Sequence, residues 1–187
     1  MEDLIYIGNF KDWIKDEWLE HLLNHDGDLL PKNLKNEDDE SVLPKWDDGF
    51  NASVTENFER DIVYCISYQH HNFPFKITAN DLPIDIGDKN FEFSFIKYNP
   101  GMIMPIHIDH PLYGRKFVDG EPQFDPKIER YWMSLLDYER GHVLLHNHKL
   151  FKDYKQGDLY KFQNEMDWHG SANLGKNVRL IFNFTTW

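Results

Sequence analysis

The chain has 187 residues, and its 20 basic and 32 acidic side chains give a formal net charge of −12. This length is typical of one domain with a sizeable core. The acidic balance disfavours a nucleic-acid partner, because phosphate binding needs a basic face. A single cysteine, Cys65, excludes an internal disulfide and a cysteine-based zinc cluster. With no secretory leader pattern and no long apolar run, the sequence predicts a soluble, cytoplasmic protein without a membrane segment.

The first ninety residues predict two helices and a short strand. The strand is expected at 4–7 and the first helix at 10–25, where apolar residues recur at steps of three and four. Residues 26–53 are rich in Asp, Asn, Gly and Pro and indicate an irregular connection. The second helix is expected from Thr55, a residue type favoured at helix N-caps, to about Tyr68.

From residue 91 onward the sequence predicts a β-rich region. Short runs of aromatic and β-branched residues alternate with clusters of Gly, Pro, Asn and Asp. The expected strands are 91–98, 103–108, 130–138, 142–145, 159–162 and 178–186. Helices followed by many short strands are typical of a jelly roll braced by helices. We therefore expect a mainly β, single-domain protein over 1–187, with a helical support region at 1–90 and a double-stranded β-helix (jelly roll, cupin-like) at 91–187.

The segment His107-Ile108-Asp109 is the first pattern that indicates chemistry. In an extended segment, residues two apart lie on the same side, so an imidazole and a carboxylate can converge on one ion. His169 follows later in the chain, and Arg179 stands ten residues after it. Two histidines and a carboxylate on one face of an octahedral ion leave three positions open. That arrangement suits iron(II), a bidentate cosubstrate and dioxygen.

Alternation along the last expected strand assigns a role to Arg179. Its odd-numbered residues share one face, and the opposite face holds the strongest apolar stripe, Leu180, Phe182 and Phe184. A guanidinium that faces a barrel interior needs an anion. It can pair in a two-pronged way with the distal carboxylate of a dicarboxylic cosubstrate, and 2-oxoglutarate is the candidate.

Two motifs resemble those of known enzymes. Tyr98-Asn99-Pro100-Gly101 followed by His107-Ile108-Asp109 resembles the opening of the prolyl hydroxylase branch of the Fe(II)/2-oxoglutarate-dependent oxygenase superfamily. The ending, His169 and then Arg179-Leu180-Ile181-Phe182, is similar to that of the aspartyl/asparaginyl β-hydroxylases. The resemblance covers roughly 91–187. The animal aspartyl/asparaginyl enzymes lack the carboxylate ligand, so Asp109 relates this metal centre to the prolyl hydroxylase type.

The resemblance implies a dioxygenase that hydroxylates a C–H bond with iron(II), O2 and 2-oxoglutarate. It implies that the catalytic residues are the iron ligands His107, Asp109 and His169. It also implies that Arg179 binds the distal carboxylate of the cosubstrate, with Tyr98 as a hydrogen-bond donor to the same molecule. The implied substrate is a peptidyl or protein side chain, namely proline, asparagine or aspartate.

Several side chains near the motifs have two interpretations. Arg130 is either a second anion contact for the cosubstrate or a strand-end charge, and Tyr98 is either a ligand contact or an edge-of-core aromatic. His146 and His148 alternate as metal ligands do, but we interpret them as outward polar residues. Residues 110–129 show little periodicity and directly follow the expected ligands, so we expect a substrate-covering lid there.

Two further functional hypotheses remain open. Within the same chemistry, the substrate is a free amino acid or another small metabolite. In a different class, the protein is a non-catalytic, cupin-like metal-binding domain. Arg179 discriminates between enzyme and binding domain, because a binding domain has no need of an arginine ten residues after its last ligand.

Overall fold

The computed structural model describes residues 4–25, 27–30, 45–46, 65–69, 71–108, 117–118, 121–122, 128–147, 149–163 and 168–187. Within these ranges the protein is mainly β, with one α-helix, α1 (Asp16–Asn24), and short 3-10 helices at Lys11–Trp13 and Ala79–Asp81. The strands are β1 (Ile5–Asn9), β2 (Asp28–Leu30), β3 (Lys45–Trp46), β4 (Cys65–Tyr68), β5 (Phe91–Tyr98), β6 (Ile103–Ile108), β7 (Phe117–Val118), β8 (Glu121–Pro122), β9 (Glu129–Ser134), β10 (His142–His146), β11 (Lys149–Phe151), β12 (Asp158–Lys161), β13 (His169–Asn173) and β14 (Arg179–Thr186).

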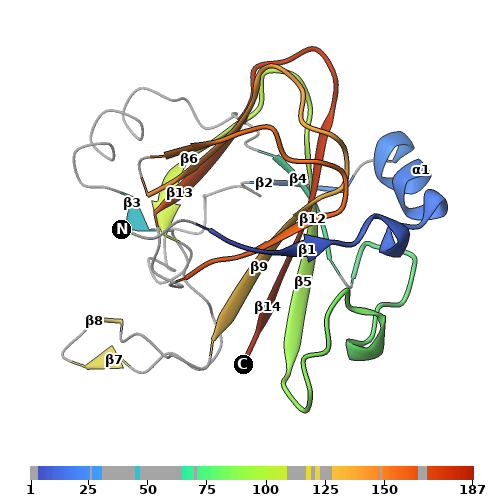
Figure 1. The fold of residues 1–187 in the computed structure, drawn as a ribbon. Helices are drawn as coiled ribbons and strands as arrows, with labels where there is room; N and C mark the ends of the chain where they lie inside the picture. Colours follow the sequence, from blue (N-terminus) through green and yellow to red (C-terminus); the bar gives the residue numbers. More distant parts are fainter. Residues whose placement is uncertain are drawn as a thin grey trace.

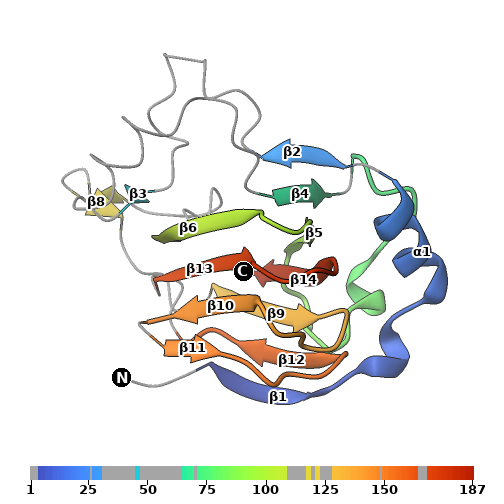
Figure 2. The ribbon, with the colours of Figure 1, turned by 90° about the horizontal axis from the view of Figure 1, so that it is seen from above.

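The strands form two antiparallel sheets that face each other (Figures 1 and 2). The larger sheet has seven strands in the order β1-β12-β9-β14-β5-β4-β2, and the smaller has five in the order β11-β10-β13-β6-β3. Strands β7 and β8 form a separate hairpin pair. The two sheets converge at the β5–β6 and β13–β14 turns and diverge away from them (Figure 1). This is the jelly-roll architecture expected from the sequence.

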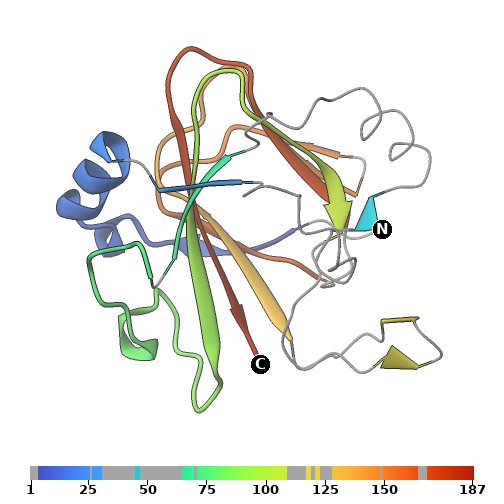
Figure 3. The ribbon, with the colours of Figure 1, turned by 180° about the vertical axis from the view of Figure 1, so that it is seen from behind.

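Two hydrophobic cores lie on opposite sides of the seven-stranded sheet. The outer core joins that sheet to α1 and to the 73–86 segment, and it includes Trp18, Leu22, Phe73 and Phe95. Helix α1 and this segment cover one side of the molecule (Figure 3). The inner core lies between the two sheets and comprises Leu4, Cys65, Tyr98, Trp132, Leu144, Tyr154, Phe162 and Ile181.

Strand β14 contributes to both cores, as its alternation predicts. Leu180, Phe182 and Phe184 belong to the outer core, whereas Ile181 belongs to the inner one. The strand pairs with β5 without interruption from the Arg179–Tyr98 pair to the Thr186–Phe91 pair, and on its other side it pairs with β9. Because side chains alternate along a strand, Arg179 shares the inner face with Ile181.

The helix expected at 10–25 is shorter and divided in two. The 3-10 turn ends at an extended Ile14, and α1 begins after Lys15 with Asp16 and Glu17 in its first turn, where acidic residues favour the helix dipole. Lys97, which is 4% exposed, closes the other end. Its Nζ donates to the carbonyl oxygens of Leu22 and His25, both at 2.9 Å. Among the described residues, no helix has the length and hydropathy that a bilayer crossing requires.

The prediction of a second helix is wrong for the part of it that the structure describes. Residues 55–64 lie outside the described part, but Cys65–Tyr68 is the strand β4, paired with β5 and β2. All four of its residues are buried, with Cys65 in the inner core and Ile66 and Tyr68 in the outer core. A strand buried on both faces lacks the alternation that identifies a half-exposed one. The N-terminal region is therefore more than a helical support, since β1, β2 and β4 extend the large sheet.

Candidate functional site

Arg179 is the most unusual buried side chain of the inner face. It is 1% exposed, and its Nε donates to the hydroxyl of Tyr154 at 3.1 Å. Within the described residues, neither Nη1 nor Nη2 has a hydrogen-bond partner, although both are buried. A charged group in a low-dielectric interior is costly unless it is paired. The two terminal nitrogens of the guanidinium are therefore free to bind an acceptor that the described residues do not supply.

Aromatic rings surround this guanidinium. Its Cζ lies 5.2 Å from the ring centre of Tyr98, its cross-strand partner, and 5.9 Å from the ring of Trp132. Tyr154 contacts Trp132 edge-on, with ring centres 5.0 Å apart. Cations over aromatic faces are attracted by the ring quadrupole, and the planar guanidinium also stacks on rings. The rings thus surround the guanidinium with groups that favour a positive charge.

Tyr98 connects the two sheets at this point. Its side chain hydrogen-bonds with Ser171 of β13, and it is 2% exposed. Burial raises the pKa of the phenol far above its usual range, although the positive charges of Arg179 and Arg130 oppose that rise. The hydroxyl is therefore neutral at physiological pH, and it lies where both guanidinium groups act on it.

Arg130 is the second guanidinium beside the inner core. It is the second residue of β9, and its Cζ lies 5.0 Å from the ring centre of Phe162. Burial raises the pKa of Glu92, and the charge of Arg130 lowers it, so a carboxylate lies within electrostatic reach of Arg130. Both residues pair with Thr185 of β14, one from each side. Arg130 thus differs from Arg179 in having an acidic neighbour.

The expected metal ligands fall on adjacent strands of the smaller sheet. His169 is 8% exposed and begins β13, a strand that the sequence did not predict. It lies directly opposite His107 of β6 in the strand register. Asp109 lies outside the described residues. Within the part of the chain that the structure describes, no cluster of three or more His, Cys, Asp or Glu residues could hold a metal ion. The structure therefore pairs two of the three proposed ligands by register and leaves the third untested.

His146 is a third histidine in this row, and its interpretation as an outward residue is wrong. It is 1% exposed and pairs with His169 across β10 and β13. The ring of Phe162 contacts both, with centres 5.2 Å from His146 and 5.4 Å from His169. Alternation with the buried Leu144 was the available signal, because residues two apart share a face. His148 lies outside the described residues.

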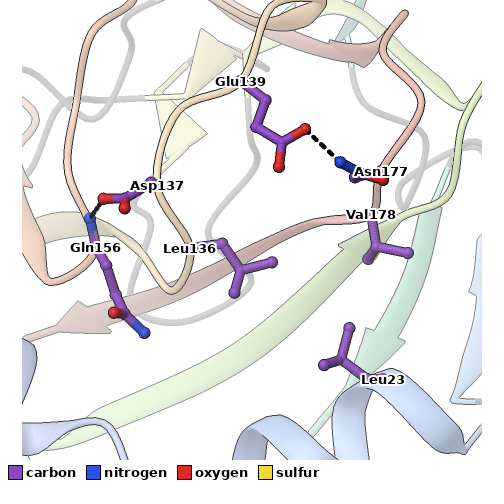
Figure 4. A pocket seen from close by; sticks show the side chains of 7 residues that line it. All are labelled: Leu23, Leu136, Asp137, Glu139, Gln156, Asn177 and Val178. Atoms are coloured by element: carbon purple, nitrogen blue, oxygen red, sulfur yellow. Dashed lines mark hydrogen bonds between the residues drawn. The ribbon is translucent and has the colours of Figure 1, made fainter.

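The rest of the proposed surroundings is only partly described. Most of the expected lid at 110–129 lies outside the described residues, and the described part of it is limited to the short strands β7 and β8 and residues 128–129. A separate pocket of about 420 Å³ opens between the end of α1 and the loops before β10, β12 and β14 (Figure 4). It is lined by Leu23, Leu136, Asp137, Glu139, Gln156, Asn177 and Val178. None of the site residues expected from the sequence lines this pocket.

Comparisons with known proteins support the fold. No protein-family model matches the chain. No curated protein matches it in sequence. Among solved structures, it is similar to the non-heme alpha ketoglutarate dependent carbocyclase SnoK from nogalamycin biosynthesis, with a TM-score of 0.51, 12% identity, and coverage of 74% of this chain and 73% of that one.

Weaker similarities are to cupins. The Cnp3 cupin domain of Schizosaccharomyces pombe has a TM-score of 0.38 and 10% identity over 65% of this chain, which spans only 63% of that chain's length. A cupin 2 conserved barrel domain protein from Salinispora arenicola has a TM-score of 0.36 and 10% identity over 66% of this chain and 75% of that one. The two facing antiparallel sheets and the similarity to the carbocyclase show a cupin-like double-stranded β-helix fold.

Proposed function

We propose that this protein is an Fe(II)- and 2-oxoglutarate-dependent dioxygenase that hydroxylates a C–H bond. The observation that carries the proposal is Arg179, whose two terminal nitrogens are buried between the sheets without a hydrogen-bond partner among the described residues. A carboxylate accepts two parallel hydrogen bonds from such a fork. A dicarboxylic cosubstrate would supply that carboxylate and neutralise the charge.

The surroundings of Arg179 suit this role. The rings of Tyr98 and Trp132 already lie beside the guanidinium before a ligand arrives. A pre-organised binding group loses little conformational freedom on binding, which favours affinity. The neutral hydroxyl of Tyr98 lies beside it and is able to donate to the same carboxylate. The SnoK carbocyclase, described as alpha ketoglutarate dependent, offers an example of this cosubstrate in a similar fold.

The residues available for iron are compatible with a facial triad. His107 and His169 occupy paired positions on β6 and β13, and residues opposite each other in antiparallel strands lie on one face of the sheet. Asp109 follows His107 by two residues in the sequence, the spacing of one strand face. Bound iron(II) would supply the activation of dioxygen. The protein would hold the ligands, orient the cosubstrate through Arg179 and exclude water with the inner-core rings.

We further propose a peptidyl or protein side chain as the substrate, with a free amino acid or small metabolite as the alternative. Arg130 would act as a second anion contact, because it borders the inner core against Phe162 and acts on the same phenol as Arg179. A screen of peptides and free amino acids for stimulated succinate release would separate these substrate classes. Release stimulated only by free amino acids would overturn the protein-substrate proposal.

The main experiment is an anaerobic titration of the protein with iron(II) and 2-oxoglutarate. We expect a weak visible charge-transfer band in the wild type that is lost in Asp109→Ala and His169→Ala. In Arg179→Met, the affinity for 2-oxoglutarate measured from this band should fall at least tenfold. Arg140→Met is the matched control, because Arg140 is exposed and its loss removes the same charge. The wild type should then form succinate under air.

Two results would contradict the proposal. One is a wild-type protein that gives neither the band nor succinate; a cupin-like binding domain would then be the better description. The other is equal 2-oxoglutarate affinity in Arg179→Met and Arg140→Met, which would show that the buried fork does not bind the cosubstrate.

A further inference from the structure

Trp132 has a buried hydrogen-bond donor with no acceptor in the described part of the chain. It lies in β9 and is 2% exposed, and its Nε1 is buried without a partner. An indole N–H only donates, so no rearrangement of its own proton can satisfy it. A buried donor without an acceptor costs free energy, and buried polar groups in native proteins nearly always have partners. The indole therefore needs an acceptor from outside the described residues.

This donor belongs to the same interior as Arg179. The Cζ of Arg179 lies 5.9 Å from the Trp132 ring. Tyr154 contacts both residues, since its hydroxyl accepts from Nε of Arg179 and its ring lies 5.0 Å from the indole. The unpartnered atoms of Arg179 and Trp132 are Nη1, Nη2 and Nε1, and all three are donors. A group that only accepts hydrogen bonds, such as a carboxylate, is the chemical complement of such a set.

We propose that the Trp132 indole N–H is a second donor to the carboxylate held by Arg179, so that Trp132 makes the site selective for dicarboxylates. This inference rests on the proposed function and adds a residue to it. Arg179 alone supplies charge and a two-pronged contact. Trp132 adds a third, directional hydrogen bond that only a ligand with a distal carboxylate can use.

The neighbours of Trp132 also fix the position of its indole ring. Its ring packs against Tyr154 and, at 5.6 Å, against Tyr160. Strand pairing with Asn183 on β14 and Tyr160 on β12 fixes its backbone on both sides. A fixed indole leaves the carboxylate little freedom to shift along the barrel. A dicarboxylate one methylene longer than 2-oxoglutarate would therefore misplace its keto acid end.

Asn183 provides the competing explanation. It lies directly opposite Trp132 in the strand register, and its Oδ1 is a buried acceptor without a partner among the described residues. A water molecule between the two side chains would satisfy the indole with no ligand involved. In that case the loss of the indole N–H would leave dicarboxylate affinity unchanged, and the two explanations are separable by experiment.

The first test measures ligand affinity in Trp132→Phe, which keeps an aromatic ring and removes the N–H. We expect 2-oxoglutarate affinity to fall about tenfold or more, the loss typical of one hydrogen bond to a charged group. Pyruvate, which has no distal carboxylate, should bind the variant and the wild type equally. Trp18→Phe is the matched control, because Trp18 is equally buried but lies in the outer core.

The second test observes the indole directly and does not depend on the folding of a variant. In protein with nitrogen-15-labelled tryptophan, the N–H resonance absent from Trp132→Phe identifies Trp132; if that variant does not fold, selective assignment on the wild type replaces it. We expect glutarate and 2-oxoglutarate to shift this resonance downfield in wild-type protein and pyruvate to leave it in place. Glutarate lacks the keto acid, so its effect is independent of iron and of turnover.

These outcomes separate the inference from the proposed function. The role of Trp132 would be overturned if its resonance in an active wild type did not shift with either dicarboxylate. It would also be overturned if Trp132→Phe kept the wild-type affinity for 2-oxoglutarate. Neither result would contradict the oxygenase proposal. A shift of the Trp132 resonance with glutarate, in a protein that forms no succinate, would support the dicarboxylate site and contradict the oxygenase assignment.

Discussion

Arg179 and Tyr98 lie directly opposite each other in β14 and β5, with the guanidinium carbon 5.2 Å from the centre of the phenol ring. An uninterrupted run of strand pairing follows this pair to the end of β14. The backbone therefore fixes the position of the charge before any ligand binds. A charge held in this way is suited to binding an anion, and it lowers the stability of the protein when no anion is bound.

Replacement of Arg179 by Met should stabilise the ligand-free protein. The substitution removes a buried charge with two unpartnered nitrogens and keeps an apolar side chain of similar length. Replacing a buried, poorly satisfied charge by an apolar residue is often stabilising, here by about 1–2 kcal/mol. Urea unfolding without ligand measures the effect, and exposed Arg140→Met should change stability by less than about 0.5 kcal/mol. A loss of stability in Arg179→Met would show that the guanidinium is satisfied in the free protein.

Phe162→Leu should weaken iron binding more than it weakens the fold. The Phe162 ring contacts His146, His169 and Arg130, and it is 5% exposed. Loss of the ring should cost about 1 kcal/mol of stability and lower iron(II) affinity about tenfold, because it frees the imidazole of His169, a proposed iron ligand. Phe151→Leu is the control, since Phe151 packs on the same core against Tyr160. Equal iron affinity in both variants would contradict a positioning role for Phe162.

Glu129 should make stability depend on acid pH. Burial raises the pKa of this carboxyl, but ion pairs with Lys161 and Lys89 and a hydrogen bond from Tyr131 outweigh burial and lower the pKa to about 2. A lowered folded-state pKa contributes stability above the unfolded value near 4.5, and that contribution is lost as pH falls toward 2. Allowing for solvent screening, the contribution is about 2 kcal/mol at pH 7.

The corresponding measurement compares Glu129→Gln with the wild type by chemical denaturation from pH 7 to pH 2. The variant should be about 2 kcal/mol less stable at pH 7, and the difference should vanish near pH 2. Glu20→Gln, which removes an exposed carboxylate of α1, should show no such convergence. A difference that persists unchanged at pH 2 would mean that the side chain stabilises β9 by packing alone.

The Cys65 thiol should be unreactive until the protein unfolds. It is fully buried in the inner core, and burial raises its pKa to about 12. Because the thiolate is the reactive form, a thiol reagent at pH 8 should modify the native protein at least a thousandfold more slowly than the urea-unfolded chain. The rate should follow the unfolded fraction across a urea titration. Rapid modification in native buffer would show that β4 opens locally.

The strands of the second half of the chain that are rich in aromatic and β-branched residues were predictable. The bounds expected for 91–98 and 103–108 coincide with β5 and β6, and 178–186 differs from β14 by one residue. β13 was not predicted, because its sequence, His-Gly-Ser-Ala-Asn, lacks the β-branched and aromatic residues that identify strands. Small residues are needed there: a Cβ at Gly170 would lie 3.2 Å from the backbone of Ile106.

The candidate site, too, could be predicted only in part from the sequence. The order and spacing of His107, His169 and Arg179 along the chain indicated a cosubstrate site, and the structure pairs the two histidines by register. The aromatic surroundings of Arg179 could not be read from the sequence, because Tyr98, Trp132 and Tyr154 come from distant segments. His146 was misread because its neighbours beyond β10 suggested an exposed strand end. Cross-strand register between distant segments depends on the whole fold, so it could not be read from local patterns in one sequence.

Because side chains alternate along β14, the packing of the N-terminal region in the outer core also fixes the position of Arg179 on the inner face. Leu180 and Phe182 anchor the strand in the outer core, where Phe182 lies against Trp13 at 4.8 Å. A slip of one residue would exchange Arg179 for Leu180 at the inner face and remove the Arg179 guanidinium from the barrel interior. Packing in the outer core therefore determines whether a charged or an apolar side chain of β14 faces the barrel interior. Changes that loosen the packing of the first turns of the chain should first appear as a loss of the proposed 2-oxoglutarate binding, before any loss of the fold.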